Sequence, residues 1–495
     1  MTPEVYRERW AALRGGRPDE EKLGHLARQV ALSFMDRSLF NDLYEDAYID
    51  LLCEMATAPG AEGAAGAAAS ALFGIVVEGL CDDFEDLQAA IYNRVMEQVL
   101  EYCRRRPGGE DLDRRLAASG LRGTGDLLAR VESLRGAAAA VPKGPPPARI
   151  LFLSRMTIGA DVAVTSVLIR RFGDAFPGAE IVLVGDPKLA QILGGNPRLR
   201  FRPLEYARRG GLLERFGAWH RVAEVVEEES RPGRMWVVDP DSRLTQLGIL
   251  PVTAPGSYLF FNSRSDAPGG PRVSMSELAN AWADRVTGAA PHAHPAVWLP
   301  EPLRKGGEAL AGALRKQGAR QIVTVNLGVG GNPRKRIGDE FEEKLLAYLL
   351  EDPKTVVVLD KGMGAEELER TGSLLRALAA RGTAVGESRF GAPPPPVGGG
   401  HGILALECGI GELAAVIARS DEYVGYDSAG QHIAAALGVP ACTVFAGSNN
   451  PRFVRRWRAC GPAKVKVVHV DTLTRAPLFD AEDIIARVAF AREEP

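Results

Sequence analysis

The segment from Asp427 to His432 carries the groups best suited to bind an anion. It follows an apolar strand pattern at 422–426 and opens a helix pattern that continues to Leu437. Backbone N–H groups at such a helix start, with the Ser428 hydroxyl beside them, would form an anion site of the kind that holds a diphosphate. The same residues allow a plainer interpretation, in which Asp427 only caps the helix and His432 is a satisfied polar side chain.

Charged residues follow two other short apolar patterns. Asp161 comes after a glycine-containing loop that follows residues 150–154, and it begins a helix pattern. Lys335 and Arg336 lie in a turn that follows residues 322–326. A carboxylate can take a proton from a reacting hydroxyl, and cations can neutralise a departing anion. An N-cap at Asp161 and a solvated basic turn at Lys335 and Arg336 would explain the same residues.

Alternating strand and helix patterns surround these residues in two consecutive blocks, residues 148–303 and 304–495. Strands separated by helices form βαβ units, which give parallel sheets with right-handed crossovers. The expected fold is therefore α/β, with two tandem Rossmann-like doubly wound domains. Such sheets bind ligands outside the carboxyl ends of their strands, so we expect a cleft between the domains. The predicted strands are 150–154, 181–184, 235–238, 258–261, 322–326, 355–359, 422–426, 441–445 and 465–470.

Residues 1–147 follow a different pattern. Apolar residues recur at spacings of three and four up to about Arg135, without an alternating strand signature, which predicts an all-α N-terminal domain. This domain ends in a connector rich in Pro, Gly and Ala, residues 136–147 (GAAAAVPKGPPP). Its three consecutive prolines cannot continue a helix and favour an extended chain.

Composition and charge exclude several classes of protein. The 495 residues are 46% hydrophobic and 25% charged, as in ordinary globular proteins. The net charge is −3, so no bulk basic field draws the chain onto nucleic acid. The N-terminus lacks the apolar core of a signal peptide. A stretch without charged or amide side chains, residues 63–77, is too short to span a bilayer and predicts a buried helix of small residues.

Cysteine and histidine usage gives no sign of a metal or of disulfides. The six cysteines form no CxxC pair, and Cys408, without an evident histidine partner, is expected in the core. His292 and His294 have no third ligand at a readable spacing. We expect the reducing cytoplasm, where the protein could also lie peripherally at the inner face of the membrane.

Asp427 begins a stretch, DSAGQHIAAALGVP, that resembles the donor-binding region of the heptosyltransferase-type glycosyltransferases, glycosyltransferase family 9. The family pattern is D-[ST]-G-x-x-H followed by AAALG-P. Asp427, Ser428 and His432 match it, whereas Ala429 stands where the family has glycine. The preceding residues, GELAAVIARSDEYVGY, extend the resemblance.

Two other regions resemble the family in the same order along the chain. Residues 155–184 are similar to its opening R-L-S-S-L-G-D segment, with Asp161 on the loop aspartate proposed as the catalytic base and Ala160 in place of a glycine. The stretch VNLGVGGNPRKRIGDEFEEKL is similar to the phosphate-contacting loop, with Lys335 and Arg336 at its basic positions.

The resemblance covers about residues 149–472 and implies the GT-B fold. It implies inverting, metal-independent transfer of a sugar from a nucleotide-diphosphate donor, ADP-heptose-like or other, in bacterial glycosylation. The acceptor would be a glycan, a lipid-linked glycan or a protein, and no cofactor is expected. Asp161 would be the base. The donor would contact Gly328, Lys335, Arg336, Glu366, Asp427, Ser428, Ala429, Gly430 and His432; Glu366 rests on a weaker similarity.

Other interpretations remain open. The chain could be a catalytically degenerate sugar-nucleotide binding or scaffold protein, because alanines replace two family glycines that approach the ligand. A sugar-nucleotide epimerase of similar fold is disfavoured by the order of the matching segments.

The DxD form at 239–241 suits metal-dependent glycosyltransferases with a single domain, and a turn is the better interpretation. The helical domain lies outside the resemblance and could bind the acceptor, mediate oligomerisation or cover the cleft.

Overall fold

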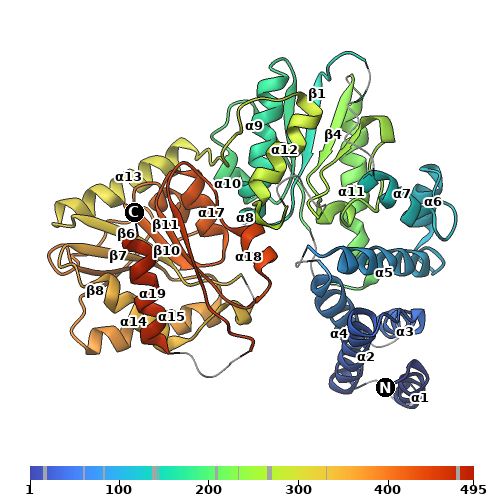
Figure 1. The fold of residues 1–495 in the computed structure, drawn as a ribbon, viewed down its shortest axis with the longest axis horizontal. Coiled ribbons are helices and arrows are strands. Elements are labelled where there is room, and N and C mark those ends of the chain that lie inside the picture. The colour runs from blue at the N-terminus through green and yellow to red at the C-terminus, as the bar shows by residue number, and fades with distance from the viewer. Residues whose placement is uncertain are drawn as a thin grey trace.

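The computed structural model shows three parts that follow one another along the chain (Figure 1). It describes residues 1–14, 19–58, 62–81, 84–136, 142, 144–206, 210–231, 233–264, 270–330, 332–474 and 480–494. Residues 137–141 and 143 of the predicted connector lie outside the described residues, as does Gly331.

The first α/β part is built on a five-stranded parallel sheet with the order β3-β2-β1-β4-β5. In β1, residues Ile150 and Phe152 pack with α9 and α12, whereas Leu151 and Leu153 pack on the opposite face with α11. Both faces are buried, as expected for a parallel sheet covered by helices. The strands are β1 (Arg149–Leu153), β2 (Glu180–Gly185), β3 (Leu199–Pro203), β4 (Met235–Asp239) and β5 (Tyr258–Phe260). The α-helical and π-helical elements are α8 (Ile158–Ala160), the π-helical turn η2 (Asp161–Thr165), α9 (Ser166–Ala175), α10 (Leu189–Leu193), α11 (Leu212–Ser230) and α12 (Met275–Thr287).

The second α/β part contains a seven-stranded parallel sheet with the order β12-β11-β10-β6-β7-β9-β8. Its strands are β6 (Gln321–Asn326), β7 (Thr355–Asp360), β8 (Val385–Arg389), β9 (Gly402–Glu407), β10 (Glu422–Tyr426), β11 (Ala441–Phe445) and β12 (Val465–His469). Its helices are α13 (Glu301–Lys316), α14 (Asp339–Leu349), α15 (Ala365–Ala380), α16 (Ile410–Ile417), α17 (Ala429–Ala436), α18 (Pro451–Trp457) and α19 (Ala481–Glu493). The α/β class and the two doubly wound sheets predicted from the sequence are confirmed.

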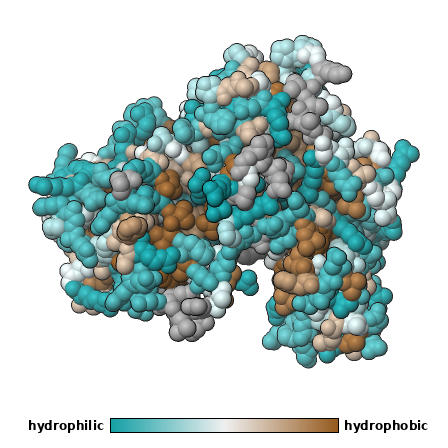
Figure 2. Space-filling view, in the orientation of Figure 1, coloured by the Kyte–Doolittle hydropathy of each residue, from teal (hydrophilic) through white to brown (hydrophobic). Residues whose placement is uncertain are grey.

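The N-terminal part is helical, as predicted, and it shares a core with the first sheet. One cluster of buried apolar side chains runs from Val76, Val95 and Val99 of this part to Leu151 and Leu153 of β1. In Figure 2, apolar surface gathers over the upper part of the helical region, beside the hollow that separates it from the second α/β part. Its helices are α1 (Pro3–Arg14), α2 (Glu20–Phe40), α3 (Asp46–Ala56), α4 (Glu62–Ala71), the π-helix η1 (Leu72–Val77), α5 (Asp86–Arg104), α6 (Glu110–Ala118) and α7 (Asp126–Gly136).

The stretch of small residues at 63–77 forms α4 and η1, which pack on α2 and α3. Ala68, Ala69 and Leu72 are fully buried there, so the prediction of a buried helix is confirmed. Among the described residues, no helix is both long enough and apolar enough to cross a bilayer.

Candidate active site

The strand order of the second sheet reverses between β6 and β10, whose carboxyl ends lie side by side. Doubly wound sheets bind ligands at such a switch point. β6 ends at Asn326, and β10 ends at Tyr426, directly before Asp427 and Ser428. Helix α17 then begins at Ala429. The segment predicted to bind an anion therefore lies at the switch point.

The first turn of α17 faces this point without a side-chain cap. Ser428, the N-cap, has an extended backbone and makes no capping bond within the described residues. Its Oγ instead donates to Asn326 Oδ1 at 3.4 Å. A Cβ on Gly430 would lie 2.2 Å from the Tyr423 hydroxyl oxygen, so only glycine fits there. The N–H groups of Ala429 and Gly430 lie in the first turn of the helix, where they have no partner within the helix and can stabilise an anion.

Lys335 reaches the same point from the loop after β6. Its Nζ lies 2.6 Å from Asp427 Oδ2 and 5.7 Å from the centre of the Phe453 ring. The other carboxylate oxygen of Asp427 accepts a hydrogen bond from Gln431 Nε2 at 2.6 Å. The Lys335 side chain is 24% exposed, against 7% for Asp427. The carboxylate therefore holds the ammonium group in place while leaving part of it open to a ligand.

Arg336 is engaged elsewhere. Its Nε and Nη2 atoms donate to the two carboxylate oxygens of buried Glu342 at 2.6 and 2.8 Å, and Nη2 also contacts Asp339. Tyr426 donates its hydroxyl proton to Glu342 as well, at 3.1 Å. These bonds fasten the loop to α14. A phosphate contact by Arg336 stays a prediction.

Glu366 is exposed in the first turn of α15. The neighbouring Glu367 is the residue that faces the loop after β6: its Oε1 lies 3.5 Å from where a side chain on Gly328 would begin. Its Oε2 accepts a hydrogen bond from the backbone N–H of Met363 at 2.7 Å. Donor contacts by Glu366 and Gly328 stay predictions.

Asp161 is buried, with 1% of its surface exposed, in the turn that follows β1 and α8. Its carboxylate accepts hydrogen bonds from Ser154 Oγ at 2.6 Å, Thr165 Oγ1 at 2.7 Å and the Arg155 N–H at 2.8 Å. Burial raises the pKa of this carboxyl group, although the hydrogen bonds act in the opposite direction. A carboxylate has about four acceptor positions, so three donors leave one. In this structure the aspartate fixes the loop, and its role as a base stays a prediction.

The two α/β parts touch where α8 meets α17. A Cβ on Gly159 would lie 3.2 Å from Ala429 Cα and 3.1 Å from His432 Cδ2, so α8 approaches α17 closely at a glycine. His432 is 5% exposed. Burial, with a smaller effect of Lys335, lowers the pKa of His432 to about 3. His432 therefore stands as a neutral imidazole at the contact between the parts.

Trp457 is a cleft residue that the sequence prediction missed. Its ring centre lies 6.0 Å from that of His432, 5.9 Å from that of Phe84 in the helical part and 5.8 Å from the Arg155 guanidinium carbon. All three parts of the chain therefore meet at this indole. A single aromatic residue in a short helix gave no sequence signal, whereas Asn326, also missed, could have been found as the polar end of a predicted strand.

The DxD segment forms the turn after β4, as predicted. Asp239 accepts hydrogen bonds from Thr245 Oγ1 and the Tyr258 hydroxyl, both at 2.5 Å, and burial raises its pKa to about 6. Asp241 is 2% exposed and accepts a hydrogen bond from Ser263. Asp239 therefore binds the turn to β5, whereas Asp241 faces a cavity described below.

The remaining sequence candidates are separate from the switch point. His292 Nε2 lies 3.2 Å from Asp284 Oδ2, and His294 is exposed. Cys408 is half-buried rather than fully in the core, with its Sγ 3.8 Å from Asp360 Oδ1. In the part of the chain that the structure describes, no three His, Cys, Asp or Glu side chains are grouped as a metal site.

Comparison with known proteins bears on this site. The model of glycosyltransferase family 9 (heptosyltransferase) matches residues 402–488, which include Asp427 to His432. The solved glycosyl transferase family 9 structure from Veillonella parvula DSM 2008 has a TM-score of 0.50 and 18% identity, and the match covers 72% of this chain and 98% of that one. At this identity the likeness shows a shared fold.

Two E. coli structures are also similar. ADP-heptose lps heptosyltransferase II has a TM-score of 0.47 and 16% identity, with 70% of this chain and 99% of that chain covered. Heptosyltransferase WaaC with ADP has a TM-score of 0.46 and 14% identity, with 69% and 99% covered. No curated protein sequence matches this chain. The family match and the two-sheet fold confirm the resemblance expected from the sequence, and they identify the chain as a glycosyltransferase similar to those of family 9.

Proposed function

We propose that the protein transfers a sugar from a nucleotide-diphosphate donor, ADP-heptose-like or another, to a glycan, lipid-linked or protein acceptor. Transfer would invert the configuration at the anomeric carbon and need no metal ion. The observation that carries the proposal is the meeting of Lys335 with the first turn of α17 at the switch point between β6 and β10. A fixed cation and open N–H groups are what a departing diphosphate needs.

In the proposed reaction, the acceptor oxygen attacks the anomeric carbon from the face opposite the diphosphate. The bond from that carbon to the diphosphate oxygen breaks, and negative charge grows on the leaving oxygen. Lys335 and the N–H groups of Ala429 and Gly430 would stabilise this charge because they are positioned before the reaction begins. The acceptor proton passes to a carboxylate, for which we propose Asp161. Its one remaining acceptor position must become accessible when substrates bind.

A sugar-nucleotide binding protein without transfer activity is the second candidate. The burial of Asp161 and its three hydrogen bonds favour this alternative, because a base must reach the acceptor. Ala429 itself lies against Gly159, since a Cβ on that glycine would be 3.2 Å from Ala429 Cα.

Titration calorimetry with ADP, UDP and GDP sugars tests donor binding. We expect one of them to bind, and we expect Lys335→Ala and Asp427→Ala to weaken it at least tenfold. Lys344→Ala is the control, because this lysine of α14 pairs with Glu340 and Glu482, away from the switch point. Binding without release of nucleoside diphosphate in the presence of candidate acceptors would support the second candidate. Failure of every nucleotide sugar to bind would contradict both.

A further inference from the structure

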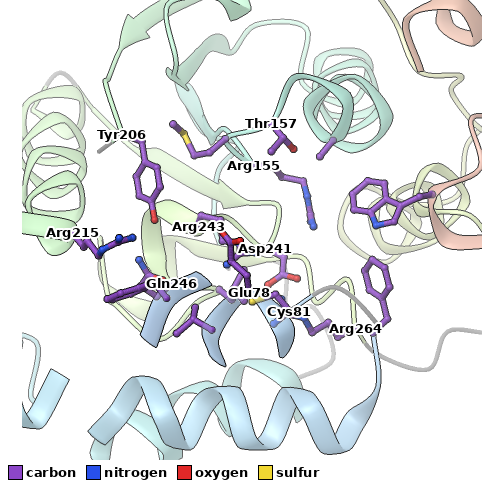
Figure 3. A pocket seen from close by; sticks show the side chains of 17 residues that line it. Glu78, Cys81, Arg155, Thr157, Tyr206, Arg215, Asp241, Arg243, Gln246 and Arg264 are labelled. Carbon is purple, nitrogen blue, oxygen red and sulfur yellow. The ribbon is translucent and has the colours of Figure 1, made fainter. Parts of the chain in front are cut away.

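A cavity of about 160 Å³ lies between the helical part and the first α/β part (Figure 3). Phe73 and Val77 of η1, with Phe84 before α5, form one wall, and the loops after β1 and β4 form the other. Thr157 and Ala160, which come shortly before Asp161 in the chain, also line it. The cavity therefore adjoins the side of the cleft where the proposed acceptor would react.

The lining is rich in positive charge. Arg155, Arg215, Arg243 and Arg264 contribute four guanidinium groups, against the carboxylates of Glu78 and Asp241. Among the lining residues that the structure describes, two positive charges are therefore in excess. Figure 3 shows these side chains arriving from different elements around one space. A phosphate monoester carries between one and a half and two negative charges near neutral pH, which matches this excess.

Two of these guanidinium groups, those of Arg264 and Arg215, have buried donors without a partner among the described residues. Arg264 is 5% exposed, and its Nε and Nη1 atoms have no hydrogen-bond acceptor there. Arg215 is 8% exposed, and its Nε is likewise unpartnered while its guanidinium lies over the Phe73 ring at 4.2 Å. Buried guanidinium donors are normally satisfied. Within the described residues, these donors are therefore open to a ligand.

The backbone around the cavity is held in an uncommon conformation. Within the described residues, six residues other than glycine have a positive φ angle, and five of them line this cavity. These are Phe84, Met156, Asp241, Gln246 and Leu247, with φ between 49° and 67°. Such strain gathers at ligand sites, where the surrounding structure over-determines the backbone.

We propose that this cavity binds a phosphate-like oxyanion carried by the acceptor, so that the helical part takes a direct share in acceptor recognition. The anion would lie between Arg215, Arg264 and Arg243. A volume of 160 Å³ is that of roughly five waters, enough for a phosphate and a few carbon atoms but not for a whole glycan. The aromatic rings of Phe84 and Trp457 would cover the carbon atoms. This inference rests on the proposed function.

Calorimetry with inorganic phosphate, glucose 6-phosphate and glucose, each in the presence of saturating ADP, tests the site. We expect glucose 6-phosphate to bind more tightly than inorganic phosphate, and glucose not to bind. Arg264→Gln and Arg215→Gln should each weaken the binding of glucose 6-phosphate at least tenfold. Arg221→Gln, an exposed arginine of the same helix as Arg215, should leave it unchanged. If the Arg264 variant fails to fold, the Arg215 variant carries the test.

Binding that ADP abolishes, or that neither substitution weakens, would overturn the proposal, because the anion would then occupy another site. Inorganic phosphate binding as tightly as glucose 6-phosphate would overturn the acceptor assignment, since the site would then serve a free anion. A separate ADP titration of the same proteins reports on the donor. If none of the ADP, UDP and GDP sugars binds while glucose 6-phosphate still binds, the proposed function fails and the anion site stands.

Discussion

Replacing His432 by glutamine tests whether the two α/β parts meet around a neutral imidazole. Burial, with a smaller contribution from Lys335, lowers the pKa of His432 from 6.5 to about 3 in the folded protein. Below pH 6.5 the unfolded chain therefore binds a proton that the folded chain does not. The free energy of unfolding must fall as the pH falls from 6.5 toward 3, because protons favour the state that binds more of them.

The magnitude follows from the size of the shift. One pKa unit corresponds to about 1.4 kcal/mol, and about 1.5 units separate 6.5 from pH 5, so His432 should cost the protein about 2 kcal/mol between pH 7 and pH 5. The His432→Gln variant lacks this term. Other groups that titrate in the same range contribute equally to both proteins, so the difference between the two slopes isolates the imidazole.

Urea unfolding at pH 5, 6 and 7 measures these slopes. The matched control is His25→Gln, which removes an exposed imidazole from α2. The wild type and the His25 variant should each lose about 2 kcal/mol more than the His432 variant between pH 7 and pH 5. Equal slopes in all three proteins would show that His432 is protonated in the folded state, which would refute the buried contact between α8 and α17.

Two further predictions concern the turns that bear the candidate site. Gly430→Ala should lower the free energy of unfolding by roughly 1–3 kcal/mol, because its Cβ would lie 2.2 Å from the Tyr423 hydroxyl oxygen. The control Gly372→Ala should not lower it, because its Cβ would meet only the end of a flexible arginine at 3.4 Å. Equal denaturation midpoints for the two variants would argue against this packing. Asp161→Ala should slow transfer at least about 100-fold with little change in donor affinity, as for loss of a general base, whereas Thr165→Val, which removes one hydrogen bond to that carboxylate, should slow it less than about tenfold. Equal losses of rate in the two variants would assign Asp161 to positioning the loop.

Most strands could be predicted because parallel strands buried on both faces are uninterrupted apolar runs, as in β11, ACTVF. The strands β3, β8 and β9 were not predicted. β3 (LRFRP) and β8 (VGESR) lie at sheet edges and carry charged residues, so their strand state depends on pairing with β2 and β9. β9 (GILALE) is apolar but follows a run of three glycines and His401, and its position in the sheet comes from pairing with β7 and β8.

The candidate site was predicted as segments rather than as contacts. The sequence pattern indicated Asp427 and Lys335, but the two lie 92 residues apart, and their ion pair depends on the order of β6 and β10 in the sheet. No sequence pattern indicated the direction in which a side chain points. Arg336 lies next to Lys335 yet binds Glu342 of α14, and Asp161 turns inward to the hydroxyls beneath its loop.

An experimental structure of the protein with the nucleoside diphosphate of its donor bound tests the donor site most directly. We expect the diphosphate at the N-terminus of α17, within hydrogen-bond distance of Lys335 Nζ and of the backbone N–H groups of Ala429 and Gly430. A diphosphate bound elsewhere, such as between the arginines of the cavity beside the helical part, would contradict the assignment of the donor site to the switch point between β6 and β10.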